Sequence, residues 1–582
     1  MSLDVSVRVV DADGVIPPPG PLPVARLRPP LTRQRFIMRT VIVVFAAATV
    51  WAWRYTEMSI TAITSGFSDM MNLLDRMTPP SFARLDNTLG VAFETLWMAV
   101  IGTTIAVLLS VPLAFGAARN TTPHPIVAKL CRAVIVMSRA IPDLLFAAIF
   151  VRALHIGVLP GILALGLHSI GMVGKLFADA IEQTSPSPRD AVSSVGASKW
   201  QAIMTSVVPQ AMPGFIATSL YRLDINLRSA TVLGIVGAGG IGFTLKQFTG
   251  SLQWNKALGV VIVIFAFITV MEFVSALVRS TLLGGDRTMV GRSAPRFSLG
   301  SWVATRLRRG SSASVGMRAF DQSTVHPPLT GERLAKLVYG GFFSGLIAFA
   351  FWSVRLNPFD VVTAFPDMWR VTTRMFPLDF STARSSIVKG LVESIAIALM
   401  ATFFGFIFAL PLGMLAARNV TANRIVYAFA RITVTLLRGT PELIVCVIFV
   451  SAMGLGPIPG IFALVIGTTG FFAKLIADAA EEVDPMPREA VFTTGATRLQ
   501  ESTTSVIPQA LPAIIGNLLY VLDINLRASA ILGIVGAGGI GTLLMSSIKV
   551  LQMQTTGAII LSIFVIVYGI ELLAGWVRKQ IL

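Results

Sequence analysis

The side chains of this sequence that could act on a ligand are charged residues inside long apolar runs, and they occur twice. The hexapeptide LDINLR at 223–228 returns at 522–527, which puts Asp224 four residues before Arg228 and Asp523 four before Arg527. At that spacing, two side chains share one face of a helix. An arginine in an apolar helix can pair with the carboxylate or bind an anion. Both interpretations stay open: ion pairs that hold helices in register, or a path for an anion.

Two further pairs have the same spacing, Arg139 with Asp143 and Arg438 with Glu442. Each pair encloses a proline, which is expected to bend its helix. Lysines also occur with an acid four residues on. They can form a local ion pair or reach the membrane interface, or they can contribute to anion passage. These lysines and their acids are Lys175 with Asp179 and Lys474 with Asp478.

One histidine in an apolar run, His168, has no counterpart in the second copy, where Gly467 occupies the matching place. Arg222 is matched in the same way by Val521. A lone histidine is either a packed core residue or a substrate contact that can titrate. The candidate residues of a substrate path are Arg139, His168, Lys175, Asp224, Arg228, Arg438, Lys474, Asp523 and Arg527.

The composition requires a membrane environment for these charges. The 582 residues are 54% apolar and 13% charged, whereas soluble domains carry about 25% charged residues. Cys131 and Cys446 lie in apolar runs and the four histidines have no ligand spacing, so we expect no disulfide framework and no metal site. The net charge of +17 is concentrated in tails and loops. That distribution indicates membrane topology rather than nucleic-acid binding.

The apolar runs predict an all-α polytopic membrane protein with six spans in each copy and about twelve in all, since each run is near the ~20 residues that cross a bilayer. The fifth of each copy is the least apolar. The predicted spans are 36–53, 96–114, 131–151, 158–178, 211–235 and 257–277, then 336–354, 395–413, 430–450, 457–477, 510–534 and 556–576.

The two copies keep one register, with an offset of 299 residues from about residue 88 to the end of the first copy. An even number of spans returns the chain to the same side, so the copies are expected to be parallel repeats around an axis along the membrane normal. Arginines and lysines in the tails and the link predict that both termini are cytoplasmic. The predicted organisation is a disordered tail at 1–35, repeat 1 at 36–283, a basic flexible linker at 284–335 and repeat 2 at 336–582.

A polar segment follows the fourth span of each copy. It reads SPSPRDAVSSVGASKW from residue 185 and DPMPREAVFTTGATRL from residue 484. The prolines predict a short helix with an acid in its first turn, and Gly196 or Gly495 is expected to end it. The segment is either a surface connector or a docking site for a soluble subunit. The chain has no GxxxxGK[ST] phosphate loop, so an ATPase that drives it would be another protein.

A second repeated segment, GAGGIG, follows the fifth span of each copy. Glycine permits close helix contact and positive backbone φ angles. Irregular backbone at membrane depth is tolerated where it is buried or lines a cavity. These glycines are therefore candidates either for helix packing or for an outer gate. They are Gly237, Gly239, Gly240 and Gly242, with Gly536, Gly538, Gly539 and Gly541.

An acid-Ala-xxxx-Gly element followed by VVPQAMP (207–213) or VIPQALP (506–512) resembles the coupling loop of ABC importer permeases. Together with LxxxxR[SA][AS] and GAGGIG, it resembles the phosphonate permease family over roughly 36–283 and 336–582. The resemblance implies the type I importer permease fold, here as a tandem fusion. Copy one departs from the usual Glu-Ala with Asp-Ala, which shortens the reach of the acid. The implied ATPase-coupling residues are Arg189, Asp190, Ala191 and Gly196, with Arg488, Glu489, Ala490 and Gly495.

This resemblance implies a multi-pass permease of the bacterial cytoplasmic membrane that imports phosphonate, phosphate or phosphite by alternating access. The implied partners are two ATPase subunits and an extracytoplasmic solute-binding protein. The permease itself would catalyse no covalent step and bind no cofactor, because ATP and Mg²⁺ would be held by the ATPases. Two alternatives are an ABC permease for an amino acid or a quaternary amine, and an ion-coupled secondary transporter. For the latter, the clearest shared unpaired acids are Glu94 and Glu393, at a span edge.

Overall fold

A computed structural model describes residues 33–282 and 331–581, apart from positions 84, 357, 382 and 422. Most of the predicted tail at 1–35 and of the predicted linker at 284–335 therefore lies outside the described residues. The first helix of each repeat begins slightly before its predicted boundary, at Arg33 and at Gly331.

Repeat 1 contains only helices and turns among its described residues. Its third helix is 33 residues long, about 50 Å at 1.5 Å per residue, so it exceeds a ~30 Å hydrocarbon core and must tilt or protrude. The helices are α1 Arg33–Tyr55, α2 Ile60–Met77, α3 Leu85–Ala117, α4 Pro125–Ala140, α5 Asp143–Leu154, α6 Val158–Glu182, α7 Pro186–Ser194, α8 Lys199–Ala202, α9 Val208–Leu233, α10 Gly240–Gly250 and α11 Trp254–Leu282.

Repeat 2 follows the same order, except that two short helices stand where repeat 1 has α2. Its helices are α13 Gly331–Ser353, α14 Pro358–Thr363, α15 Phe365–Thr373, α16 Arg384–Leu415, α17 Arg424–Gly439, α18 Glu442–Met453, α19 Pro457–Glu481, α20 Pro485–Thr493, α21 Arg498–Glu501, α22 Ile507–Leu532, α23 Ile540–Lys549 and α24 Met553–Ile581. In both repeats a π-helical turn precedes the fifth span, at Ile203–Val207 and Ser502–Val506.

The described residues contain nine helices long and apolar enough to cross a membrane, and eleven when each bent pair counts as one span. Helix α13 stands in the place of the remaining predicted span, and its residues Gly340–Ser353 form a shorter apolar helix. The third spans are not continuous helices over 131–151 and 430–450. The pair α4 and α5 bends by 86°, and the pair α17 and α18 bends by 78°. The break falls at Pro142 and Pro441, which confirms the expected bend and shows that it is sharp enough to end the helix.

The first helix of each repeat packs against the other repeat. Helix α1 packs on α16 of repeat 2, and α13 packs on α3 of repeat 1. Aromatic rings mark both contacts: Trp53 lies 5.9 Å from Phe404 between ring centroids, and Trp97 lies 5.2 Å from Phe349. The two repeats therefore cover parts of each other's core, and hydrophobic residues of both repeats form one continuous cluster.

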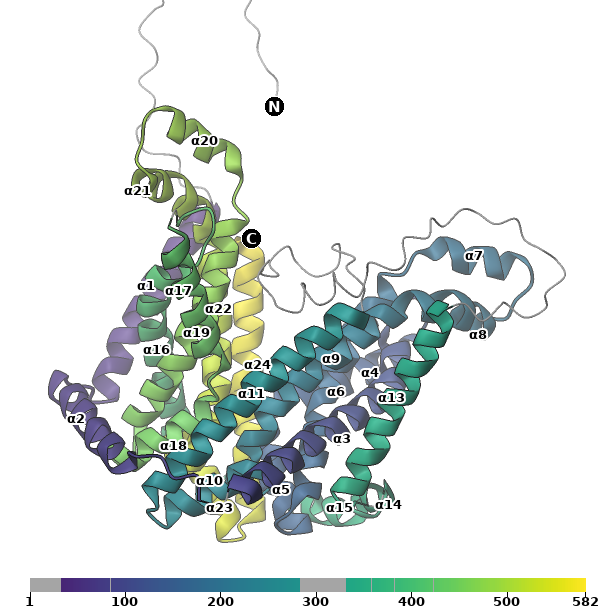
Figure 1. Cartoon of the computed structure of the whole chain (residues 1–582), viewed down its shortest axis with the longest axis horizontal. Helices are drawn as coiled ribbons and strands as arrows, with labels where there is room; N and C mark the ends of the chain where they lie inside the picture. Colours follow the sequence, from purple (N-terminus) through teal and green to yellow (C-terminus); the bar gives the residue numbers. More distant parts are fainter. Residues whose placement is uncertain are drawn as a thin grey trace, which may run out of the picture.

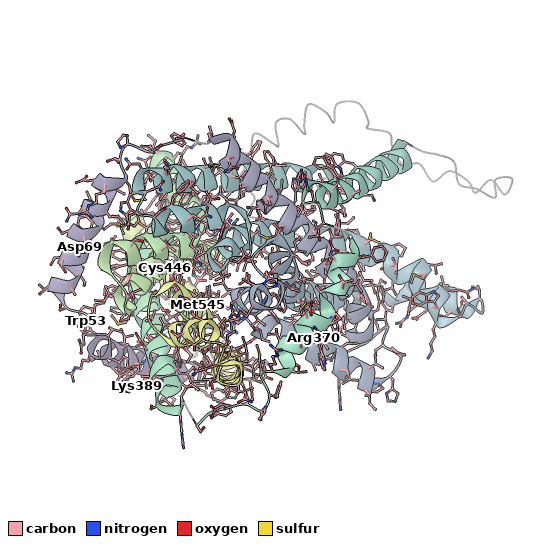
Figure 2. All side chains as sticks on the ribbon, turned by 90° about the horizontal axis from the view of Figure 1, so that it is seen from below. Trp53, Asp69, Arg370, Lys389, Cys446 and Met545 are labelled. Carbon is pink, nitrogen blue, oxygen red and sulfur yellow. The ribbon has the colours of Figure 1, made fainter. Side chains whose placement is uncertain are left out.

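The repeats converge at the end that carries α10 and α23 and diverge toward α7 and α20 (Figure 1). The amide Nε2 of Gln34 at the start of α1 donates to the Ile581 carbonyl at the end of α24, so the first and last spans have these ends on the same side. Figure 2 shows Asp69 of α2 and Arg370 of α15 at opposite sides of the bundle. Equivalent elements thus surround a central axis, as expected for parallel repeats.

Candidate functional site

The proposed coupling helices α7 and α20 project from one end of the bundle (Figure 1). Neither helix has a buried residue. Gly196 and Gly495 follow them with φ angles of +88° and +81°, a conformation that glycine adopts without strain. Asp190 is 68% exposed, and Glu489 and both alanines, Ala191 and Ala490, are exposed as well. These loops therefore present their charged and small side chains to the surroundings instead of using them for packing.

The acid does not lie in the first turn as the sequence predicted. Each helix begins with its first proline, Pro186 or Pro485, and neither first turn contains an acidic residue. Asp190 and Glu489 are the fifth residues of their helices. The helix dipole falls off within the first turn, so these exposed acids stabilise the helix less than expected.

The two coupling loops are anchored differently. In repeat 1, Arg189 donates through Nη1 to the Asn120 carbonyl at 3.1 Å and lies 3.6 Å from Asp190. In repeat 2, Arg488 instead pairs with Glu501, a buried carboxylate in α21. The arginine thus ties α7 to the turn after α3 in repeat 1, and α20 to α21 in repeat 2.

A second set of contacts supports the coupling end and had not been singled out from the sequence. The Asn120 side chain donates to the Ile181 carbonyl at 2.7 Å, and the Glu182 carboxylate accepts from the Arg119 amide at 2.9 Å. Arg132 also pairs with Glu182 at 3.3 Å. Repeat 2 reproduces these contacts at the matching positions Arg418, Asn419, Arg431, Ala480 and Glu481. The constant offset of these polar pairs was the signal that could have found them.

The arginines of the bent third spans pair across the repeats. Arg139 pairs with Glu571 of α24, and Arg438 lies 3.7 Å from Glu272 of α11. The predicted partners, Asp143 and Glu442, are wrong because the helix breaks between the two members of each pair, and the four-residue rule holds only within one continuous helix. The acids Glu272 and Glu571 are themselves equivalent, so two matched ion pairs cross the boundary between the repeats.

The predicted pairs of the fifth spans are confirmed. Arg228 lies 3.3 Å from Asp224 and 3.5 Å from Glu272, and Arg527 pairs with Asp523. The Nε atoms of Arg228 and Arg527 are buried and have no hydrogen-bond partner. A donor in that state loses its hydration without compensation. Each fifth span therefore carries an arginine with one buried N–H donor that has no acceptor among the described residues.

The lysine pairs differ between repeats. Lys474 pairs with Asp478, as the spacing predicted. Within the described residues Lys175 forms no ion pair with Asp179, and its side chain is exposed near the end of α6 that precedes α7. That position is compatible with a lysine at the membrane interface.

An asparagine in the repeated LDINLR segment joins three spans of each repeat, and sequence reasoning missed it. In repeat 1, Asn226 donates to Thr103 at 2.9 Å and accepts from Ser169 at 3.0 Å. In repeat 2, Asn525 makes the same contacts with Thr402 and Thr468, both at 2.9 Å. All six groups are buried. The identical geometry shows that the two repeats share one internal framework.

The GAGGIG segments form a tight turn between the fifth span and a short helix, α10 or α23, that had not been predicted. Gly237 and Gly536 have φ angles of +100° and +97°. The Ile241 amide donates to Thr95 at 2.9 Å, and the Ile540 amide donates to Ser394 at 2.9 Å. These buried turns lie where the repeats converge, so the helix-packing role is present, and the gate role stays a prediction.

Two tandem repeats of membrane-spanning helices, surface helices at one end and matched charges within the spans define a polytopic membrane transport subunit. The model of the family "Binding-protein-dependent transport system inner membrane component" matches residues 110–282 and again 409–581. The chain belongs to this family, whose members are permeases.

Curated relatives include the phosphate-import permease protein PhnE of Mycolicibacterium smegmatis, which is 45% identical over 92% of this chain and 93% of that protein. The phosphite transport system permease protein PtxC of Stutzerimonas stutzeri is 38% identical over 41% of this chain and 87% of its own length. A putative phosphite permease of the same organism, HtxC, is 36% identical over 45% of this chain and 93% of its own length. The last two cover less than half of this chain, in keeping with the tandem repeat.

Proposed function

We propose that this protein is the permease of an ATP-driven importer that carries a phosphorus oxyanion across a bacterial cytoplasmic membrane. The substrate class is phosphate, phosphite or phosphonate. Relatives named for phosphate and phosphite transport support this class, and one of them aligns over nearly the whole chain.

The observation that supports an anionic substrate is the incomplete hydrogen bonding of the arginines in the fifth spans. Arg228 and Arg527 occupy equivalent places, and each keeps a buried Nε with no partner. A passing oxyanion can accept from such donors. Because a neighbouring carboxylate already neutralises part of each charge, the anion is held weakly and can leave. A cationic solute would gain nothing from these donors.

Movement is supplied by other subunits in this proposal. Two ATPases bind ATP and Mg²⁺ beneath α7 and α20, and a soluble binding protein delivers the anion at the opposite end. Closure of the ATPases draws α7 and α20 together from the separated positions seen in Figure 1, which opens the path outward. Hydrolysis lets them separate again. The permease contributes the substrate path and the two coupling helices, and it catalyses no covalent step.

The test is uptake by liposomes that contain the permease, its two ATPases and the binding protein. Uptake of phosphate, phosphite or methylphosphonate that requires ATP and ignores a collapsed proton gradient supports the proposal. Uptake that proceeds without the ATPases would instead identify a secondary transporter. Competition by glycine betaine or an amino acid, without competition by the oxyanions, would identify a different substrate.

The coupling residues are tested in the same system with the Glu489→Lys, Gly495→Asp double variant. Reversing an exposed charge and forcing a left-handed backbone on aspartate should abolish coupled uptake while the complex still assembles. Replacement of the exposed Phe380, which lies outside both coupling loops, by serine serves as the control. Full uptake by the double variant would overturn the coupling assignment.

A further inference from the structure

Arg222 is a buried arginine that no carboxylate neutralises directly. It lies in α9 with 4% of its surface exposed. Its Nε donates to Ser169 at 2.8 Å and its Nη1 to the Met172 sulfur at 3.5 Å, while Nη2 has no partner. Asp143 is close enough for electrostatic attraction. No carboxylate oxygen in the described residues, however, lies within ion-pairing distance of the guanidinium.

Such an arrangement is costly in a membrane protein. A buried charge that lacks a paired counter-charge is strongly destabilising, and charged residues within spans usually serve a function for that reason. Arg222 is not needed for the local fold. Repeat 2 has Val521 in the same place and still forms the same asparagine framework.

Two neighbouring positions differ between the repeats together with Arg222. Repeat 1 has Asp143 and His168, and repeat 2 has Glu442 and Gly467. A Cβ atom added at Gly467 would lie 2.5 Å from Glu442 Oε1, so the longer acid occupies the space that a side chain at this position would need. In repeat 1 the shorter acid leaves room for His168, whose Nδ1 lies 2.9 Å from the Ile141 carbonyl. Repeat 1 therefore has an arginine and a histidine near a short acid, where repeat 2 has a longer acid against a glycine.

This cluster lies near the midpoints of two predicted spans and close to the other repeat. Arg222 and Ser169 are near the centres of α9 and α6. His168 also interacts electrostatically with Arg527 of repeat 2. Substrate sites of transporters built from repeats lie near the midplane, between the repeats.

We propose that Arg222 is a substrate-binding residue: its free Nη2 donates to the oxygens of the translocated phosphorus oxyanion, and Ser169 positions the guanidinium. The inference rests on the proposed function. It adds that only repeat 1 supplies this binding arginine, so that one anion is bound through repeat 1 in each transport cycle. The Ser169 hydroxyl is already engaged with Asn226 and the Leu165 carbonyl, so it orients the arginine and leaves the anion contact to Nη2.

The experiment replaces Arg222 by methionine, which keeps much of the volume and removes the charge. In the reconstituted complex, the Arg222→Met variant is expected to lower phosphate uptake at least ~10-fold. ATP hydrolysis stimulated by the phosphate-loaded binding protein should change less than ~2-fold, because hydrogen bonds from arginine to an oxyanion lie in the path and not in the coupling loops. The matched control in repeat 2 is Val521→Ile, which should leave uptake unchanged.

A second readout omits the binding protein. Phosphate, compared with sodium chloride at equal ionic strength, should raise the unfolding temperature of the unaltered permease–ATPase complex, and this rise should be lost in Arg222→Met. Wild-type uptake per ATP in Arg222→Met would overturn the inference while leaving the proposed function intact. If that variant fails to assemble, Arg222→Lys decides: reduced uptake with a smaller phosphate-dependent shift supports the inference, and unchanged values overturn it. Failure of the unaltered complex to carry any phosphorus oxyanion would overturn both.

Discussion

The two repeats have nearly the same framework but differ in the charges placed on it. The inter-repeat ion pairs and the asparagine contacts occur in both. The buried arginine at 222, the lysine pairs and the anchors of the coupling loops differ between the repeats. What is shared holds the helices together, and what differs indicates where the two halves act differently. Fusion in one chain allows such differences to persist, because each repeat always meets the other.

The shared framework predicts equal sensitivity at two glycines on the inner helices. A Cβ atom at Gly171 would lie 2.5 Å from the Arg139 amide nitrogen, and one at Gly470 would lie 2.6 Å from that of Arg438. Backbone atoms cannot move aside easily, so Gly171→Ala and Gly470→Ala should each lower the free energy of unfolding by about 2–3 kcal/mol. Thermal unfolding of the complex in nanodiscs measures this loss.

Gly569→Ala is the control for these glycines, since nothing lies within 4 Å of its added Cβ. A large loss in one repeat only would show that the framework is less symmetric than its hydrogen bonds indicate.

A smaller effect should separate the two acids of the inter-repeat pairs. Glu272 forms ion pairs with Arg228 and Arg438, whereas in the part of the chain that the structure describes Glu571 pairs with Arg139 alone. Glu272→Gln removes two ion pairs, so that Arg228 keeps only Asp224 and Arg438 loses its partner. It should cost about 2 kcal/mol of unfolding free energy, against about 1 kcal/mol for Glu571→Gln. Both values lie below the loss for fully buried pairs, because these side chains are partly exposed. The same unfolding assay checks the order, and a larger loss for Glu571→Gln would contradict it.

Loss of the acid beside each lysine should change the free energy of unfolding by a smaller amount. Asp478→Asn removes the partner of Lys474 and should cost about 0.5 kcal/mol, as expected for a partly exposed pair within one helix. Asp179→Asn removes no ion pair and should leave the unfolding temperature unchanged. Equal losses in the two variants would show that Lys175 and Asp179 also pair in the membrane.

The smallest effect is expected at the coupling acids. Exchanging their lengths in the Asp190→Glu and Glu489→Asp variants alters exposed side chains and should change stability by less than about 0.5 kcal/mol. If reach matters, Asp190→Glu raises and Glu489→Asp lowers ATP hydrolysis stimulated by the loaded binding protein, each by less than ~2-fold. Opposite signs would contradict the role assigned to the length of the acid.

Patterns within one stretch of chain were sufficient for much of this fold. Apolar length predicted the spans, and the constant offset predicted parallel repeats. Proline predicted the bends at 142 and 441. The same reasoning failed for the partners of Arg139 and Arg438, because it assumed that the helix continued through the bend. It also missed α2, whose mixed apolar and polar residues resemble neither a span nor a polar loop.

Composition, hydropathy and repetition thus determined that the chain is a helical membrane protein of two repeats, with a short surface helix after the fourth span of each. These features depend on residues close together in sequence. The partner of each charge depended on packing between segments hundreds of residues apart. Only the tertiary structure could show that α1 and α13 each pack against the other repeat. It also showed that Glu571 and Glu272 form ion pairs with arginines of the other repeat, and that the Arg222 guanidinium has no ion-pair partner among the described residues. The physical reason is that burial and ion pairing are set by what surrounds a side chain in space.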